Sequence, residues 1–386
     1  MLTSWSGAEA DAFRAVLAPF EDATGLTVVI ESTRDLRGVL TAAFIAGAPP
    51  DVTGLEGPAH MRELAANGKL RDLRDVLDMG RYRAAVAPTF IDMGSVDGRL
   101  VGVFVRSSVK GLIWYSPGVF RLGRPTEWEE LQRMALQAQS RAEAEWCVGL
   151  ASEGSSGWPG TDIIEQFLLR TGGTATYDGW VAGDLPWTSP QVRRAFELYG
   201  QVVADGAVFG GATGATKTDF RDAGEPLFST PAGCLFLPQG SFMPAFLAAP
   251  GRAPVTDYDF FPFPMLGEDT RRTVIGGGDL FGLLTDDPGA RRLMRYLVSD
   301  EAQARWVQQG GSLSVRATVT DYPDVLSQRS AELLTGAETF RFDASDQMDA
   351  ALNEAFWQAV LDITADPSRL DAALERLESI RVDGSA

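Results

Sequence analysis

Aromatic side chains in polar loops are the residues of this sequence that most clearly could bind a ligand. Trp5 is followed by Ser6 and Gly7, Trp158 lies in the segment SSGWPGTD, and Phe242 lies in PQGSF. An aromatic face accepts the C–H face of a sugar ring, whereas carboxylate, amide and guanidinium groups bind its hydroxyls. The other Trp and Phe residues fall mostly within apolar or helical patterns, which are typical of a core. The three loop aromatics therefore predict a sugar site.

The sequence offers few residues for a metal site or a nucleophilic centre. It contains two cysteines, Cys147 and Cys234, and one histidine, His60. Transition-metal sites usually need three or four Cys or His ligands, so we expect no metal and no cofactor. A Ser-His-Asp or Cys-His centre would have to use His60, for which a histidine at the surface or rim of the protein is the simpler interpretation.

Two glycine-rich segments only partly resemble nucleotide-binding loops. The segment GGATGATKT (210–218) has Thr216 where a phosphate loop has glycine, and no strong strand precedes it. The segment GGGD (276–279) follows a strand but lacks the G-x-G-x-x-G spacing. Its glycines predict positive φ angles or the close approach of another group, as in a hinge or a ligand wall.

Length and charge limit the classes of function. A chain of 386 residues predicts two domains. Its net charge of −18 argues against nucleic acid or an anionic membrane as a partner. The first residues have neither the basic region nor the apolar region of a signal peptide, so they indicate either a cytosolic protein or a mature chain.

Strands alternate with helices at the start of the chain. The segments LTSWSG, LTVVIES and PPDVTGL predict strands, and a helical pattern follows each of them. This order predicts a parallel sheet covered by helices, with ligand-binding groups at the carboxyl ends of its strands. Those ends carry Trp5 to Gly7, Arg34 and Glu56. No Pro/Ser-rich linker interrupts the chain, so we expect two lobes that share strands.

Several segments together resemble the carbohydrate-binding components of ABC importers, the extracellular solute-binding family that includes maltodextrin-binding protein. Within that family the chain looks most like α-glucoside-binding proteins. The segments span essentially the whole chain, and GWPGTD followed by TFRFDASD is the most specific combination among AGAPPDV, PTEWEEL, YDFFPFP, GGGDLFG and AFWQAV. The resemblance implies an α/β fold of two lobes, each a mostly parallel sheet flanked by helices, with the ligand in a cleft between them. The lobes would be 1–107 plus 278–315, and 108–277 plus 316–386.

The resemblance also implies roles for single residues. In the first lobe, ligand-binding positions would be Trp5, Ser6, Gly7, Glu56, Gly278 and Asp279. In the second lobe they would be Trp158, Phe242, Arg341, Asp343 and Trp357. Position 55 is a leucine where maltodextrin binders have a stacking tryptophan, which favours a small glycoside. The helical pattern around Trp357 by itself predicts a core residue.

The function that the resemblance implies is binding and not catalysis. A monomer would close its two lobes on a small α-glucoside of disaccharide size and deliver it to the permease subunits of an ABC importer. Family members are secreted, often as lipoproteins, so the chain would be a mature extracellular or periplasmic form of a lipid-anchored precursor. In that oxidising setting, Cys147 and Cys234 could form a disulfide if their strands are neighbours, or remain two buried thiols.

Two other classes of function stay open on the sequence, a binding protein for a non-sugar ligand and a glycoside hydrolase. A binding protein for a polyamine would need an acidic aromatic cage, and one for a phosphonate would need a cluster of cationic donors. A glycoside hydrolase would need a pair of catalytic carboxylates, and the 52 acidic residues give no way to choose that pair.

Overall fold

The computed structural model describes residues 1–33, 35–268 and 270–384. The chain divides into two compact units. The first unit is Met1–Ser108 with Gly277–Thr335, and the second is Val109–Gly276 with Gly336–Ala386. These units differ from the lobes expected from the sequence mainly in residues 316–335, which belong to the first unit. Strands β6 (Val103–Val109) and β11 (Thr273–Leu283) each continue from one unit into the other.

The first unit contains a sheet in which β1 lies between β2 and β3. β1 pairs parallel with both neighbours, and β3 pairs antiparallel with the second half of β11. The elements of this unit are β1 (Leu2–Thr3), α1 (Ala8–Thr24), β2 (Glu31–Ser32), α2 (Leu36–Ile45), β3 (Val52–Leu55), α3 (Gly57–Ala66), α4 (Met79–Ala85), α5 (Pro88–Met93), β4 (Ser95–Val96), β5 (Arg99–Leu100), α11 (Pro288–Leu297), α12 (Asp300–Gln308) and α13 (Val325–Gly336).

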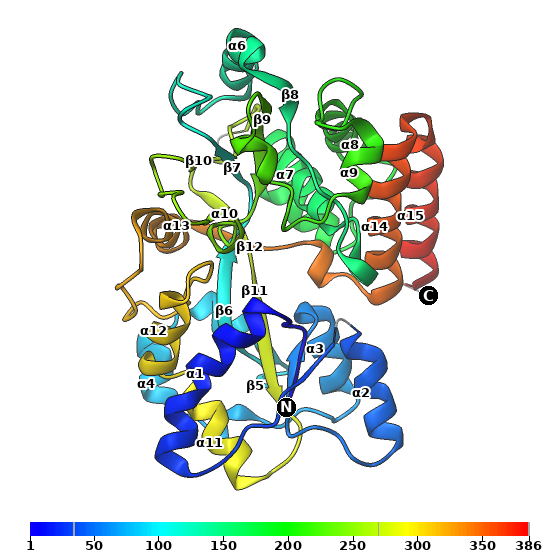
Figure 1. Cartoon of the computed structure of the whole chain (residues 1–386). Helices are drawn as coiled ribbons and strands as arrows, with labels where there is room; N and C mark the ends of the chain where they lie inside the picture. The colour runs from blue at the N-terminus through cyan, green and yellow to red at the C-terminus, as the bar shows by residue number, and fades with distance from the viewer. Residues whose placement is uncertain (34, 269, 385–386) are drawn as a thin grey trace. The chain divides into compact units, whose positions relative to one another are not determined.

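Helix α1 forms where the apolar spacing predicted a helix. Phe13, Val16, Leu17 and Phe20 recur on one face, and all four are buried. Gly25 ends the helix in the left-handed conformation, with φ of 69°. This buried face packs beside α12, and Figure 1 shows the two helices near each other within the first unit.

The second unit contains a four-stranded sheet in the order β10-β7-β9-β8. Only β8 and β9 pair parallel, because helices connect them, whereas β7 pairs antiparallel with both β9 and β10. The expectation of a mostly parallel sheet is therefore wrong here. Alternation of strands and helices predicts parallel pairing only between strands that follow each other in sequence, and β7 pairs instead with β9 and β10. The strands are β7 (Leu112–Tyr115), β8 (Ala142–Trp146), β9 (Ala232–Gln239), β10 (Asp259–Pro262) and β12 (Thr339–Phe342), the last of which pairs with the first half of β11.

Helices of the second unit build a core rich in aromatic rings. They are α6 (Trp128–Ala138), α7 (Trp158–Val181), α8 (Pro190–Val202), α9 (Gly211–Lys217), α10 (Pro244–Leu247), α14 (Ala350–Ala365) and α15 (Leu370–Gly384). Figure 1 shows α14 and α15 side by side, in orange and red. Phe356 of α14 packs against Trp187 and against Phe196 of α8, with ring centroids 4.9 and 5.8 Å away. These contacts hold α14 against the rest of the unit.

The structure joins Cys147 and Cys234 by a disulfide. Cys147 directly follows β8, Cys234 lies in β9, and their Cα atoms are 5.5 Å apart. The two strands are parallel neighbours, which brings residues 87 apart in sequence within reach of each other. The bond fastens the edge strand β8 to the interior of the sheet.

The GGGD segment is not a turn. Gly276, Gly277 and Gly278 lie inside β11, which continues through Leu283, and none of them has a positive φ. A Cβ on Gly278 would lie 2.6 Å from the carbonyl oxygen of Arg106. Of the two expectations for these glycines, positive φ is wrong and close approach is right, because the backbone of β6 leaves no room for a side chain at Gly278.

Candidate functional site

Trp158 is the first residue of α7 and the centre of an aromatic cluster in the second unit. The preceding Gly157 has φ of 112°, and Pro159 suits the first helical turn, where no backbone N–H is needed. The partly buried Trp158 ring meets Phe220 at 5.1 Å and Phe242 at 6.0 Å between ring centroids. The structure thus brings together two of the three aromatic residues that the sequence singled out, Trp158 and Phe242. Trp158 begins a helix and does not lie in a loop as expected.

The ammonium group of Lys110 lies over the Trp158 ring, 4.6 Å from its centroid. It also contacts two carboxylates, Asp162 Oδ2 at 2.7 Å and Asp343 Oδ2 at 3.2 Å. The exposed fractions of these three charged side chains are only 11%, 7% and 3%. Burial by itself lowers the pKa of Lys110, but the two carboxylates outweigh it and raise that pKa, so the lysine is charged. We call Lys110, Asp162 and Asp343 the Lys110 cluster.

A third buried carboxylate, Glu165, ties α7 to the segment that follows β12. It accepts hydrogen bonds from the amides of Ala344 and Ser345, at 2.8 and 3.1 Å, and from the hydroxyl of Tyr177 at 2.8 Å. Ser345 in turn donates to Asp343 at 2.7 Å. Burial raises the pKa of Glu165 well above its usual range, and the nearby carboxylates add to this effect. Asp343, which was predicted to bind the ligand, is therefore buried within a structural network.

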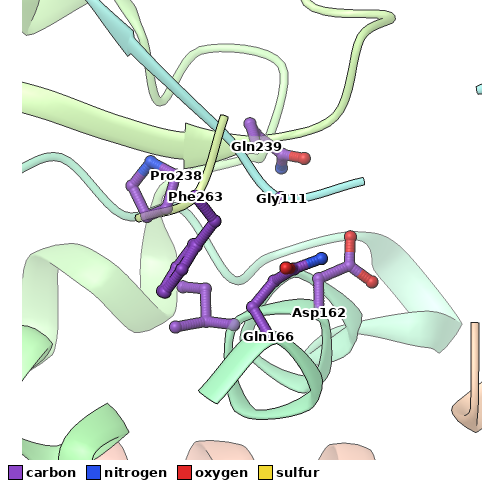
Figure 2. Close-up of a pocket in the computed structure, with 7 residues that line it drawn as sticks. Gly111, Asp162, Gln166, Pro238, Gln239 and Phe263 are labelled. Atoms are coloured by element: carbon purple, nitrogen blue, oxygen red, sulfur yellow. The ribbon is translucent and has the colours of Figure 1, made fainter. Parts of the chain in front are cut away.

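A small pocket lies beside the Lys110 cluster. Figure 2 shows Asp162 and Gln166 on one helix, below Gly111, and the full lining is Gly111, Asp162, Ile163, Gln166, Pro238, Gln239 and Phe263. Gly111 has φ of 69°, and a Cβ there would collide with the Gln166 amide. The pocket has room for a water-sized group and not for a sugar ring. It is thus a feature of the packing beneath the candidate site.

In the first unit, Arg106 of β6 is the centre of a charged cluster on an aromatic base. Its Nε donates to Asp279 of β11, and its Nη2 donates to Glu9 of α1 at 2.8 Å. The guanidinium lies 5.0 Å from the ring centroid of Trp5 and 5.7 Å from that of Trp306. The exposed fractions are 22% for Arg106, 24% for Glu9 and 32% for Asp279. We call these three charged residues the Arg106 cluster.

Trp5 lies beneath the Arg106 cluster and not at the surface. Its side chain is 1% exposed, and its ring packs against Phe13, Phe281 and Trp306. The strand-end position suggested a ring open to a sugar, but long-range packing has buried it. Ser6 and Gly7, which follow it, are exposed.

Glu56 is bound to a neighbouring arginine. Its carboxylate pairs with Arg37 Nε at 2.9 Å, and Arg37 also pairs with Glu63. The Glu56 amide donates to Nδ1 of His60 at 3.2 Å. His60 is buried, which corrects the expectation of a surface histidine, and burial lowers its pKa to about 4. Arg34, the other predicted residue of this region, lies outside the described residues.

The remaining predicted residues lie in the second unit. Arg341 of β12 makes a two-pronged ion pair with Asp178, through Nε to Oδ1 and through Nη2 to Oδ2 at 2.7 Å. Trp357 of α14 is partly buried, and its backbone carbonyl lies where a Cβ on Gly157 would collide with it. Trp357 thus lies next to the turn that begins α7.

Two central residues, Arg106 and Lys110, were missed as candidates. The sequence does contain a signal for them, because the stretch from Arg106 to Lys110 is a polar break between two apolar strands. What the pattern does not reveal is that a cation stands at each end of this break and that each binds two carboxylates.

Two further properties concern the described residues as a whole. Across 1–33, 35–268 and 270–384, no group of three or more His, Cys, Asp or Glu side chains could hold a metal ion. None of the helices in that part of the chain has the length and apolar character needed to cross a membrane.

The chain belongs to the bacterial extracellular solute-binding proteins, because the model of that family matches residues 5–304. The resemblance to carbohydrate-binding components of ABC importers is confirmed. The chain is 34% identical over 379 residues to the osmoprotective compounds-binding protein GgtB of Synechocystis sp., an alignment that covers 96% of this chain and 90% of the relative. It is also 34% identical over 388 residues to the alpha-glucosides-binding periplasmic protein AglE of Rhizobium meliloti, covering 96% and 84%.

A solved structure shows the same fold. A chitin oligosaccharide binding protein matches with a TM-score of 0.83 and 17% identity, covering 99% of this chain and 97% of its own. The predicted α/β fold of a two-lobe solute-binding protein is thereby confirmed, apart from the strand directions in the second sheet.

Proposed function

We propose that this protein is the extracellular sugar-binding component of an ABC importer and that it captures a small α-glucoside of about disaccharide size. Binding, without catalysis, is its whole role in this proposal. The observation that carries the proposal is the partly exposed ring of Trp158, held at the head of α7 beside Phe220 and Phe242. A ring fixed in this way offers apolar area to a sugar face without a large loss of side-chain freedom on binding.

Polar groups for the sugar hydroxyls come in this proposal from the Arg106 cluster. Its guanidinium donates and its carboxylates accept, which is the mixture that vicinal hydroxyls need. Asp279 keeps its predicted role, and Ser6, Gly7 and Gly278 border the same region of the first unit. Arg106 and Glu9 are added to the set, whereas Trp5 acts from below as the base on which Arg106 rests.

In the second unit, Trp158 and Phe242 supply the stacking surface, with Trp357 adjacent. Asp343, Arg341 and Glu56 are engaged by other side chains, so they act in this proposal by holding the site together. Closure of the two units on the sugar, delivery to permease subunits by a monomer, and a lipid anchor on the precursor are further parts of the proposal.

The substrate follows from two features. The relative AglE is described by its name as binding alpha-glucosides, and this chain is 34% identical to it over nearly the whole length. Leu55 lies where a stacking tryptophan for long maltodextrins would stand, and it is buried. Together they favour a short glycoside over a long chain.

Calorimetric titration with sucrose, maltose, trehalose and the polyamine spermidine tests the proposal. We expect at least one disaccharide to bind and spermidine not to bind. The proposal is contradicted if spermidine binds and no disaccharide does. Incubation with an aryl α-glucoside tests the absence of catalysis, since steady release of the phenol would show a hydrolase.

A further inference from the structure

The cation of each cluster is bound by two carboxylates. Arg106 contacts Glu9 and Asp279, and Lys110 contacts Asp162 and Asp343. With every group ionised, each cluster has a net charge of −1. Burial raises the pKa of Asp162, and if it keeps its proton the Lys110 cluster is neutral. In neither state does a cluster carry a net positive charge for an anion.

The other described arginines at or beside the predicted ligand-binding positions are held in the same way. Arg37 pairs with Glu56 and Glu63, and Arg341 pairs with Asp178. The chain as a whole carries a net charge of −18, which repels anions at long range. The paired arginines and the overall negative charge therefore both disfavour the binding of an anionic ligand.

We propose that the site selects neutral glycosides and rejects sugars that carry a carboxylate or a phosphate. This inference rests on the proposed function and adds the charge of the ligand to it. An anionic group that reached the Arg106 guanidinium would also lie next to the carboxylates of Glu9 and Asp279, which repel it. A neutral hydroxyl can accept from the guanidinium and donate to a carboxylate, so it meets no such repulsion.

The test compares neutral disaccharides with their phosphorylated counterparts by calorimetry at pH 7. The probe pairs are trehalose with trehalose 6-phosphate, sucrose with sucrose 6-phosphate, and maltose with maltose 6′-phosphate. For whichever neutral sugar binds, we expect the phosphorylated partner to bind at least about 100-fold more weakly, which corresponds to about 2.7 kcal/mol.

A double variant separates charge from size. In Glu9→Gln with Asp279→Asn, Arg106 keeps hydrogen-bonding partners but loses both opposing charges. We expect the affinity ratio between the neutral sugar and its phosphate to narrow at least about tenfold in this variant. Asp22→Asn with Asp92→Asn is the matched control: these exposed residues of the same unit give the same change in net charge. We expect the ratio in the control to stay within about twofold of the parent.

Each outcome decides a different point. If the phosphorylated sugar binds within tenfold of the neutral one, the charge selectivity is overturned and the proposed function stands. If the double variant does not narrow the affinity ratio, the phosphorylated sugar is rejected by its size and not by the Arg106 cluster. If the control narrows the ratio as much as the double variant does, the overall charge of the protein causes the rejection. If no neutral disaccharide binds at all, the proposed function fails and this inference fails with it.

Discussion

The Arg106 and Lys110 clusters have the same arrangement of charges but different surroundings. Each joins one cation, from β6 or the residue just after it, to two carboxylates from distant parts of the chain. The side chains of the Arg106 cluster are partly exposed, whereas those of the Lys110 cluster are nearly buried and are linked onward to Glu165 through Ser345. An ion pair that water reaches can exchange partners with a ligand, while a buried one is bound to the fold. In the proposed function, the Arg106 cluster therefore binds the ligand and the Lys110 cluster supports Trp158.

The largest expected effect is on stability, from Lys110→Met. Removing the ammonium leaves Asp162 and Asp343 buried without their counter-charge, which typically destabilises a protein by about 3–5 kcal/mol. Urea unfolding at pH 7 measures the change. The triple variant Lys110→Met, Asp162→Asn, Asp343→Asn is the control, because it leaves no charged group in the Lys110 cluster and should recover most of the lost stability. If Lys110→Met lowers the free energy of unfolding by less than about 1 kcal/mol, the Lys110 cluster contributes no more to stability than an exposed ion pair does.

The first unit has a buried titratable group, His60, that is neutral at pH 7, whereas the buried Lys110 is charged. Burial lowers its pKa to about 4, below the 6.5 of a free histidine. Between these values the unfolded chain binds more protons, so stability is fully present above about pH 6.5 and decreases as the pH falls toward 4. The difference corresponds to about 3 kcal/mol. The free energy of unfolding, measured from pH 4 to 7, should depend less steeply on pH in His60→Asn than in the parent protein. The Oδ1 of the asparagine can still accept from the Glu56 amide. Equal slopes in the two proteins would contradict the assignment.

The next effect is on binding, from Arg106→Met. We expect the affinity for the neutral disaccharide to fall about 30-fold, or about 2 kcal/mol, because the donor fork is lost. The stability loss should be smaller than in Lys110→Met, since water can solvate the partly exposed Glu9 and Asp279. Calorimetry and urea unfolding together give both values. Arg305→Met, which removes an exposed arginine paired with Glu301 in the same unit, is the control and should change neither. If Arg106→Met loses stability but binds the disaccharide as tightly as the parent does, the Arg106 cluster has a structural role and not a ligand-binding role.

The sequence predicts the local parts of this comparison well and the long-range parts poorly. Helix faces such as that of α1, and the position of Trp158 among polar residues, follow from spacing over a few residues. The partner of Arg106 in β11 lies 173 residues away, and no local pattern connects the two. Trp5 shows the same limit, because its strand end looks open until Phe281 and Trp306 cover the ring. The direction of β7 also depends on which strands become its neighbours in space.

The smallest expected effect is on binding, from the replacement of Trp158, whose ring lies over Lys110 in the second unit. Trp158→Ala removes the stacking surface, so the affinity for the disaccharide should fall at least about tenfold, or about 1.4 kcal/mol. Trp158→Phe keeps a ring in the same place and should lose less. The Lys110 cluster lies beneath the ring and is complete without it, so the melting temperature should change little. If affinity is unchanged while the melting temperature drops strongly, the ring belongs to the core of its unit. In that case the Arg106 cluster, and not the aromatic face, would have to account for binding.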